Sequence, residues 1–141
     1  MSEPTKIRRA MQLPVPLEDE EQIEFVQWLE LVGLRFTSVP NSTYTKSWSQ
    51  KSHNTAMGLR RGFPDMIVVI PPHRAKDGQG HLLCPEMKRR QGGTLSAEQK
   101  GWISALNALG SANIEARECK GCQKAKEFVL EYLIPVPVSV F

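Results

Sequence analysis

Two carboxylates and a lysine stand at the ends of two apolar segments, in a pattern that suits phosphate chemistry. Asp65 begins the run DMIVVI, and Glu86 and Lys88 close the later run HLLCPEMK. Residues two apart on a strand share a face, so Glu86 and Lys88 point the same way and Met87 points into the core. If the two runs pair as a hairpin, Asp65 falls beside Glu86, where two carboxylates repel each other unless a cation neutralises them.

The chemistry open to such a set is metal-assisted hydrolysis of a phosphodiester. Mg²⁺ prefers oxygen ligands in octahedral geometry and keeps several waters, so two carboxylates and the Met87 carbonyl suit it. A bound ion polarises the phosphoryl oxygen and lowers the pKa of its water. Lys88 would orient that water or stabilise the developing charge. The simpler alternative is a surface salt bridge between Glu86 and Lys88, because short motifs often match by chance.

Four short segments have the composition of strands, and they are 35–40, 65–70, 81–88 and 113–118. The run after Asp65 is continuously apolar, as expected of a strand that is buried on both faces. Turn-forming residues fill 71–80 and join the second and third segments. These two segments are therefore expected to form the hairpin that brings the charged residues together.

Three helices are expected around these strands. The segment LEDEEQIEFVQWLELVG has apolar residues at helical spacing, acids in its first turn and Gly33 as its C-cap. A second helix is expected within 92–110 and a third at 122–133, and the second has Thr94 or Ser96 as its N-cap. Its apolar side chains are expected to point inward, namely Trp102, Ile103, Leu106 and Leu109. The order of elements predicts an α/β fold with a small mixed sheet flanked by helices.

Charge is segregated along the chain. Residues 18–32 carry six acids and no Lys or Arg, residues 33–110 carry eleven Lys and Arg against four acids, and residues 111–141 are balanced. A basic middle is the expected footprint of a phosphate-binding surface, although a solvated basic face is an equal alternative.

The polar segment 41–62 is expected to be a long loop with one helical turn near 53–60. Its aromatic residues are candidates for stacking on bases, unless one of them only fixes the loop to the body. Its cations, and those that follow Lys88, are candidates for phosphate contacts. The candidate nucleic-acid-binding residues are Tyr44, Trp48, Lys46, Lys51, Arg60, Arg61, Arg89 and Arg90.

The remaining features are consistent with a one-domain protein. A chain of 141 residues can build one core. It has neither an apolar run long enough for a membrane span nor a secretory signal, so the cytoplasm is expected. Residues 1–17 are expected to form an arm and 134–141 an extended tail. The CKGC motif, Cys119 to Cys122, suggests a redox or zinc site, but it lacks the second ligand pair that zinc requires and is attributed to chance.

The quoted motifs together resemble the PD-(D/E)xK nuclease superfamily, and within it the VRR-NUC family in the short stand-alone form typical of bacteriophages and bacteria. The likeness rests on EDEEQIEFVQW, GFPD, EMKRRQGGTLSAEQKGW and GCQKAKEFVLEYL and spans 18–133. It implies a restriction-endonuclease-like core and Mg²⁺- or Mn²⁺-dependent cleavage of DNA by Asp65, Glu86 and Lys88. The chain departs from the family at Pro85, where an aliphatic residue is usual. This proline is expected to face the sheet edge, break the pairing or mark a bulge.

The same resemblance implies two further site residues. An acid on the first helix is expected to complete the metal site. Glu18 is preferred because Glu18 and Gln22 match a family spacing, with Glu21 as the rival. Gln99 matches a family glutamine near the site, where it would hold Lys88 or a phosphate. The alternative for Gln99 is an exposed helix glutamine.

The resemblance also implies a substrate and an assembly. Stand-alone relatives resemble resolvases that cut branched DNA such as Holliday junctions as homodimers. A two-fold dimer supplies the two sites that a four-way junction needs. The expected function is therefore a metal-dependent, structure-selective DNA endonuclease that acts in the cytoplasm of a bacterium, or of the host if phage-encoded. The alternative is a DNA-binding module of the same fold without catalysis.

Overall fold

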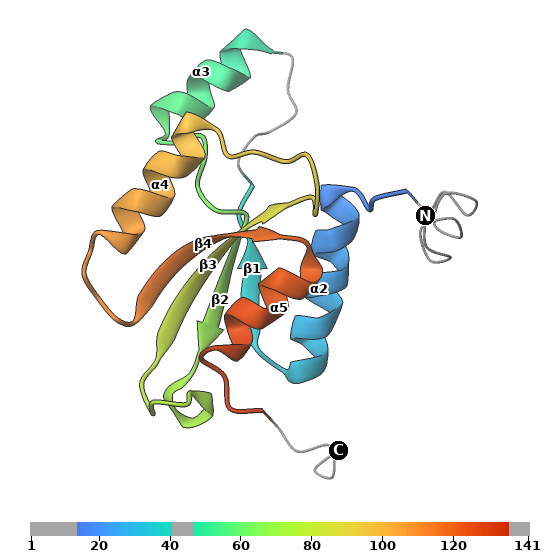
Figure 1. The fold of residues 1–141 in the computed structure, drawn as a ribbon. Coiled ribbons are helices and arrows are strands. Elements are labelled where there is room, and N and C mark those ends of the chain that lie inside the picture. The colour runs from blue at the N-terminus through green and yellow to red at the C-terminus, as the bar shows by residue number, and fades with distance from the viewer. Residues whose placement is uncertain (1–13, 41–46, 136–141) are drawn as a thin grey trace.

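Four strands form one mixed sheet in the order β1-β2-β3-β4 (Figure 1). In the computed structural model, which describes residues 14–40 and 47–135, they are β1 (Arg35–Ser38), β2 (Met66–Ile70), β3 (His81–Lys88) and β4 (Ile114–Lys120). Strand β2 is antiparallel to both of its neighbours, β1 and β3, and β4 is parallel to β3. The expected mixed sheet and the hairpin of the second and third strands are confirmed.

In the described residues, four α-helices accompany the sheet: α2 (Glu18–Val32), α3 (Trp48–Ala56), α4 (Ala97–Asn107) and α5 (Cys122–Leu130). A short 3-10 helix, η1 (Pro72–Arg74), lies between β2 and β3. None of the helices in the described parts of the chain is long and apolar enough to cross a membrane. The division into an arm, a domain and a tail stays a prediction, because residues 1–13 and 136–141 lie outside the description.

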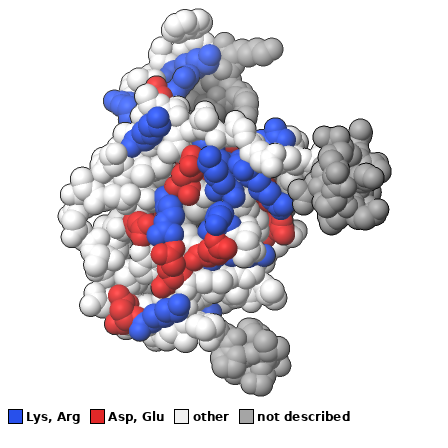
Figure 2. Space-filling view, viewed as in Figure 1, with Lys and Arg blue, Asp and Glu red and all other residues white. Residues whose placement is uncertain are grey.

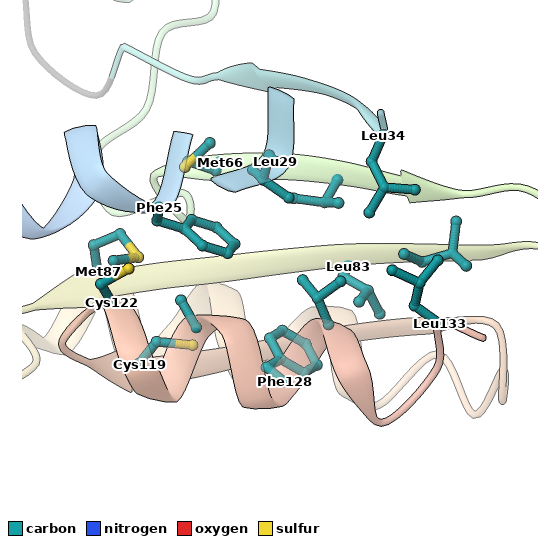
Figure 3. Packing of buried hydrophobic residues seen from close by; sticks show 14 of the residues in the cluster. Phe25, Leu29, Leu34, Met66, Leu83, Met87, Cys119, Cys122, Phe128 and Leu133 are labelled. Carbon is teal, nitrogen blue, oxygen red and sulfur yellow. The ribbon is translucent and has the colours of Figure 1, made fainter. Parts of the chain in front are cut away.

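The core lies between the sheet and the helices α2 and α5 (Figure 3). Phe25 and Leu29 from α2 and Phe128 from α5 are fully buried against Leu83 and Met87 of β3. The acids of the first turn of α2 and its left-handed glycine cap fix the ends of that helix, as its sequence predicts. One face of the central strand β3 is therefore apolar, and its other face is free to carry polar groups.

The expectation of a loop over 41–62 with one helical turn near 53–60 is wrong over Trp48–Ala56, where α3 runs, and residues 41–46 lie outside the described residues. Ser47 caps this helix by accepting a hydrogen bond from the Gln50 N–H, and the Thr55 hydroxyl donates to the Lys51 carbonyl. None of the side chains of α3 is buried. The helix has no apolar stripe to reveal it, because it packs no face against the core.

The expectation for α4 is also corrected. Ser96, rather than Thr94, is the N-cap, and the helix is shorter than the span 92–110. Its apolar residues were expected inward, but none is buried, and Leu109 is 63% exposed beyond the end of the helix. The reason is the position of α4 beside the edge strand β4, where Asn107 hydrogen-bonds the backbone N–H and C=O of Ala116.

We predict very different losses of stability for two truncations of apolar side chains that both follow a helical period in the sequence. Phe128→Ala removes a fully buried ring and should lower the free energy of unfolding by about 3–5 kcal/mol. Leu109→Ala should change it by less than about 0.5 kcal/mol, because that side chain is largely exposed. Urea unfolding followed by circular dichroism measures both, and equal losses in the two variants would contradict this core.

Candidate active site

The predicted meeting of the acidic residues occurs where strands β2 and β3 separate. Their ladder ends at the pair Val68–Leu83, and continuing the same register places Asp65 opposite Glu86. At this point the Met87 N–H donates to Asp65 Oδ2 at 2.7 Å. At the open end of the β2–β3 hairpin, the Asp65 carboxylate thus accepts the hydrogen bond that a backbone carbonyl of β2 would accept in a continuous ladder.

Pro85 explains why the two strands separate there. N–H groups along a strand point alternately to its two neighbours. The Leu82 N–H is bonded to the Asn113 carbonyl on the β4 side, so the missing N–H of Pro85 would have faced β2. Pairing with β2 stops before this residue, whereas Pro85 stays in register with Arg117 of β4. Of the three effects expected of this proline, the structure has the local break in pairing.

Glu86 is fully buried on the face of β3 opposite the core residue Met87. Its Oε1 accepts a hydrogen bond of 2.9 Å from Gln99 Nε2 and lies 3.8 Å from Lys88 Nζ. Its Oε2 is buried and receives no hydrogen bond from any donor in the described residues. The neighbouring Asp65 carboxyl lies within hydrogen-bond reach, so the two acids can share a proton but cannot satisfy each other when both are ionised.

This environment favours the protonated form of the pair. Burial, the charge of Asp65 and the hydrogen bond between the two groups raise the pKa of Glu86 to about 9, against the opposing effect of Lys88. Burial also raises the pKa of Asp65, although the hydrogen bonds from Glu86 and the Met87 N–H oppose it. A cation placed between the two acids would remove the reason for both shifts.

Gln99 connects the site to helix α4. As the third residue of the helix it accepts the Ser96 N–H through Oε1 at 2.9 Å, which leaves its amide nitrogen to donate to Glu86. The turn before β2 lies directly on this end of α4. A Cβ at Gly62, which has φ 92°, would stand 2.6 Å from the Glu98 carbonyl carbon. Only glycine lets the turn that carries Asp65 pack so closely against the helix that carries Gln99.

A second contact fixes α4 against the same turn. The ring of Phe63 meets that of Trp102 edge-on at 5.1 Å, and Trp102 Nε1 donates to the Arg61 carbonyl at 3.0 Å. The apolar residues of α4 therefore position the site rather than fill the core. Gln99 is not the exposed helix glutamine of the alternative, because it is half-buried and holds Glu86, although a contact with Lys88 or a phosphate was expected.

The two rival acids of α2 have different environments. Burial and the charges of Asp65 and Asp19 raise the pKa of Glu18, while Lys88 lowers it, so Glu18 lies within the electrostatic reach of the site.

Glu21 is instead fully buried in an ion pair. Its two oxygens accept from Arg90 at 2.8 and 3.1 Å and from the Cys122 N–H at 3.3 Å. Burial would raise the pKa of Glu21, but these hydrogen bonds and the Arg90 charge outweigh it and lower that pKa. Glu21 ties α2 to α5 and to the segment after β3, and its oxygens are occupied there.

The donor set suits a divalent cation, although it forms no complete cage. Within residues 14–40 and 47–135, no three side chains of His, Cys, Asp and Glu come together closely enough to hold an ion. Asp65 and Glu86 meet and Glu18 remains nearby, as expected if three carboxylates repel one another in the absence of an ion. Mg²⁺ is usually held by one or two carboxylates and several waters, and the unpartnered Glu86 Oε2 is a suitable oxygen.

The candidate nucleic-acid residues separate into three groups. Tyr44 and Lys46 lie outside the described residues. Trp48 is 84% exposed at the start of α3, which projects from the body of the protein (Figure 1), and the exposed cations of this region are Lys51, Arg60 and Arg61.

The third group has structural contacts. Arg89 donates to the carbonyls of Val15 and Pro16, and Arg90 is bound to Glu21. The guanidinium of Arg89 therefore anchors the chain that leads into α2. The expected role of Arg89 and Arg90 in nucleic-acid binding stays a prediction.

The cysteines form no redox or zinc site in the described structure. Cys84, Cys119 and Cys122 are free and buried, and Cys119 and Cys122 belong to the apolar core. Burial raises the pKa of all three thiols, that of Cys119 to about 12. Thiols in such surroundings are inert packing groups.

We predict that Glu86→Gln stabilises the protein without metal and flattens its pH dependence. The folded chain retains a proton on Glu86 that the unfolded chain releases above about pH 4.5, so stability falls as the pH rises towards about 9. A glutamine removes this loss, and its amide can donate to Asp65. Urea unfolding in EDTA at about pH 6 and about pH 8 measures the effect.

Glu30→Gln, at an exposed position of α2, is the matched control and should follow the wild type. Identical pH profiles for Glu86→Gln and the wild type would contradict a shared proton at this site.

The comparisons with known proteins bear on the fold of this chain. No protein-family model matches the sequence, and no curated protein matches it either. A solved structure described as "VRR_NUC domain protein" matches with a TM-score of 0.64 and 20% sequence identity, over 85% of this chain and 90% of that chain. The match confirms at the level of the fold the resemblance that the motifs suggest: this protein has the fold of a VRR_NUC domain.

Proposed function

We propose that this protein is a metal-dependent DNA nuclease of the VRR-NUC family. The observation that carries the proposal is the pairing of Asp65 with the buried Glu86, whose Oε2 has no hydrogen-bond donor in the described residues. Acids placed this way are costly for a fold without a bound cation. The position of Lys88 beside them, and the shared fold with a VRR_NUC domain protein, support a nuclease over a structural role.

The chain's own residues would divide the work as follows. Asp65, Glu86 and the Met87 carbonyl would hold the divalent ion, Mg²⁺ or Mn²⁺, and Glu18 would be a further ligand. When bound, that ion supplies Lewis-acid polarisation of the phosphodiester. Lys88, whose Nζ lies 3.8 Å from Glu86 Oε1, orients the attacking water or stabilises charge on the phosphoryl group.

Gln99 has a supporting role in this scheme. Its hydrogen bond to Glu86 Oε1 leaves Oε2 as the free ligand oxygen, and its capping contact with Ser96 holds the amide in place. The geometry of the glutamate is thus set by α4 rather than by the strand alone.

We predict that Asp65→Ala and Glu86→Ala each lower cleavage by about 10²–10³-fold or more, because the loss of one electrostatic group of an active site commonly costs this much. DNA binding should persist or tighten in both, because a carboxylate that repels phosphates has been removed. Labelled DNA incubated with Mg²⁺, with Mn²⁺ and with EDTA measures cleavage, and a mobility shift in EDTA measures binding.

Glu30→Ala, an exposed acid on α2, is the control and should cleave like the wild type. Full cleavage activity in Asp65→Ala would contradict the assignment of the active site to Asp65 and Glu86. Binding without cleavage in the wild type under any metal would instead favour the alternative of a DNA-binding module without catalysis.

Branched DNA, such as a Holliday junction, is the proposed substrate. The support is α3, a projecting helix with an exposed tryptophan and nearby cations, which suits contact with unstacked bases and backbone (Figure 1). A homodimer is proposed because two symmetric cuts require two sites. The proposed place of action is the cytoplasm of a bacterium or of a phage-infected host, where such DNA occurs.

We predict that Trp48→Ala lowers the preference for branched over linear DNA. Stacking of one base on an aromatic ring contributes about 1–3 kcal/mol, so the ratio of cleavage rates on a four-way junction and on a duplex should fall about five-fold or more. Trp48→Phe is the matched control and should keep most of the ratio. If Trp48→Ala keeps the wild-type ratio of cleavage rates, α3 does not contribute to the preference for branched DNA.

A further inference from the structure

A basic pocket lies beside the start of α5, on the far side of β3 from β2. It has a volume of about 450 Å³, and its charged lining consists of Arg90, Lys120, Lys124, Lys126 and Glu24. Figure 2 shows several Lys and Arg side chains, with Asp and Glu side chains between them, on the face of the protein that carries α5. The sequence does not suggest this pocket, because residues 111–141 have no net charge.

The positive charge of the pocket is only partly neutralised. Arg90 is bound to Glu21, and Lys124 lies 3.3 Å from Glu127. Lys120 and Lys126 have no ion pair in the described part of the chain, and Lys120 is exposed. Two cations are therefore available to an anion that enters the pocket.

The pocket begins one strand away from Lys88 of the candidate active site. Lys120 is the register partner of Lys88, and the Gly121 N–H donates to the Lys88 carbonyl at 2.9 Å. Neighbouring strands lie about 4.8 Å apart, so the backbones of the two lysines are as close as those of adjacent strands. The pocket thus begins beside the backbone of Lys88, on the α5 side of the sheet, whereas the Glu86 side chain lies on the opposite face.

The local backbone keeps the pocket closed on one side. Gly121 has φ 94°, and a Cβ there would lie 2.8 Å from both Arg90 Cγ and Glu21 Oε2. The Cys122 N–H at the start of α5 already donates to Glu21. The lysine side chains, and not the helix start, are therefore the groups that can receive a ligand.

We propose that this pocket binds phosphate groups of the DNA backbone next to the scissile phosphate. The proposal rests on the proposed function and extends its DNA footprint from the site across β4 to α5. Each strand of a duplex carries one phosphate for about every 3.4 Å of helix axis, so a strand that leaves Lys88 presents further phosphates to the neighbouring part of the protein surface. Lys120 and Lys126 bind them as point charges, without reading sequence.

The test compares salt dependence in a double variant. Binding of a fluorescent duplex is measured by anisotropy at several salt concentrations, in EDTA so that no cleavage intervenes. Lys120→Ala/Lys126→Ala should bind more weakly, and the slope of log affinity against log salt should fall by about 2, roughly 0.9 for each lost phosphate contact. Lys120→Arg/Lys126→Arg should keep the wild-type slope. Thermal melting of each variant confirms that it is folded.

Arg35→Ala/Lys76→Ala is the matched control. It removes the same charge near the opposite end of the sheet, since Arg35 pairs with Val69 and the Lys76 N–H binds the Tyr132 carbonyl. The proposal that the pocket binds phosphates is contradicted if the slope falls equally in this control, or if it is unchanged in Lys120→Ala/Lys126→Ala. If the wild type does not bind DNA, the proposed function is wrong as well. If the wild type binds and cleaves DNA but Lys120→Ala/Lys126→Ala has the wild-type salt slope, only the phosphate-binding role of the pocket is wrong.

Discussion

The site depends on a carboxyl pair that the fold cannot satisfy with its own groups. Glu86 is fully buried beside Asp65, and Lys88, at 3.8 Å from one oxygen, leaves the other oxygen of Glu86 without a partner in the described residues. Two adjacent carboxylates ionise together only when a cation compensates them. An apolar residue at Glu86 would be the more stable choice for a buried strand position. The arrangement is understandable as a receptor for positive charge, with a shared proton in its place when no ion is bound.

Local features of the neighbouring elements position the backbone around Asp65 and Glu86. Pro85 ends the β2–β3 ladder just before Glu86, so the two backbones part where the acids meet. Gly62 lets the turn before Asp65 lie on the first turn of α4, from which Gln99 reaches Glu86. On the other side, Glu21 binds Arg90 and the start of α5. The starts of α2, α4 and α5 consequently lie at the same end of the sheet, where the helix dipoles favour negative charge.

The strands and their charged ends could be predicted because they depend on local patterns. Continuous apolar runs and the two-residue period place Asp65 and Glu86 together once a hairpin is assumed, and the structure has that register. The helix α3 could not be predicted in this way, because it buries nothing and leaves no apolar period. Leu109 was misplaced for the converse reason: it continues the period of α4 beyond the end of the helix. The tie between Glu21 and Arg90 depends on residues far apart in sequence, which no local pattern reports.

Charge counted along the sequence also conceals how charge is arranged in space. If the site acts on DNA as proposed, its acids repel the phosphates, so cations on both sides are needed to draw a DNA strand across it. The exposed cations around α3 lie on one side, and the segment after β3 with the start of α5 lies on the other (Figures 1 and 2). In the second region Lys120 lines the basic pocket beside α5, and it also borders a second pocket that contains Glu118, Glu127 and Glu131. Under the proposed function, a DNA strand that contacts both regions would be held by cations on either side of the carboxyl pair, and this would help to align a phosphodiester with it.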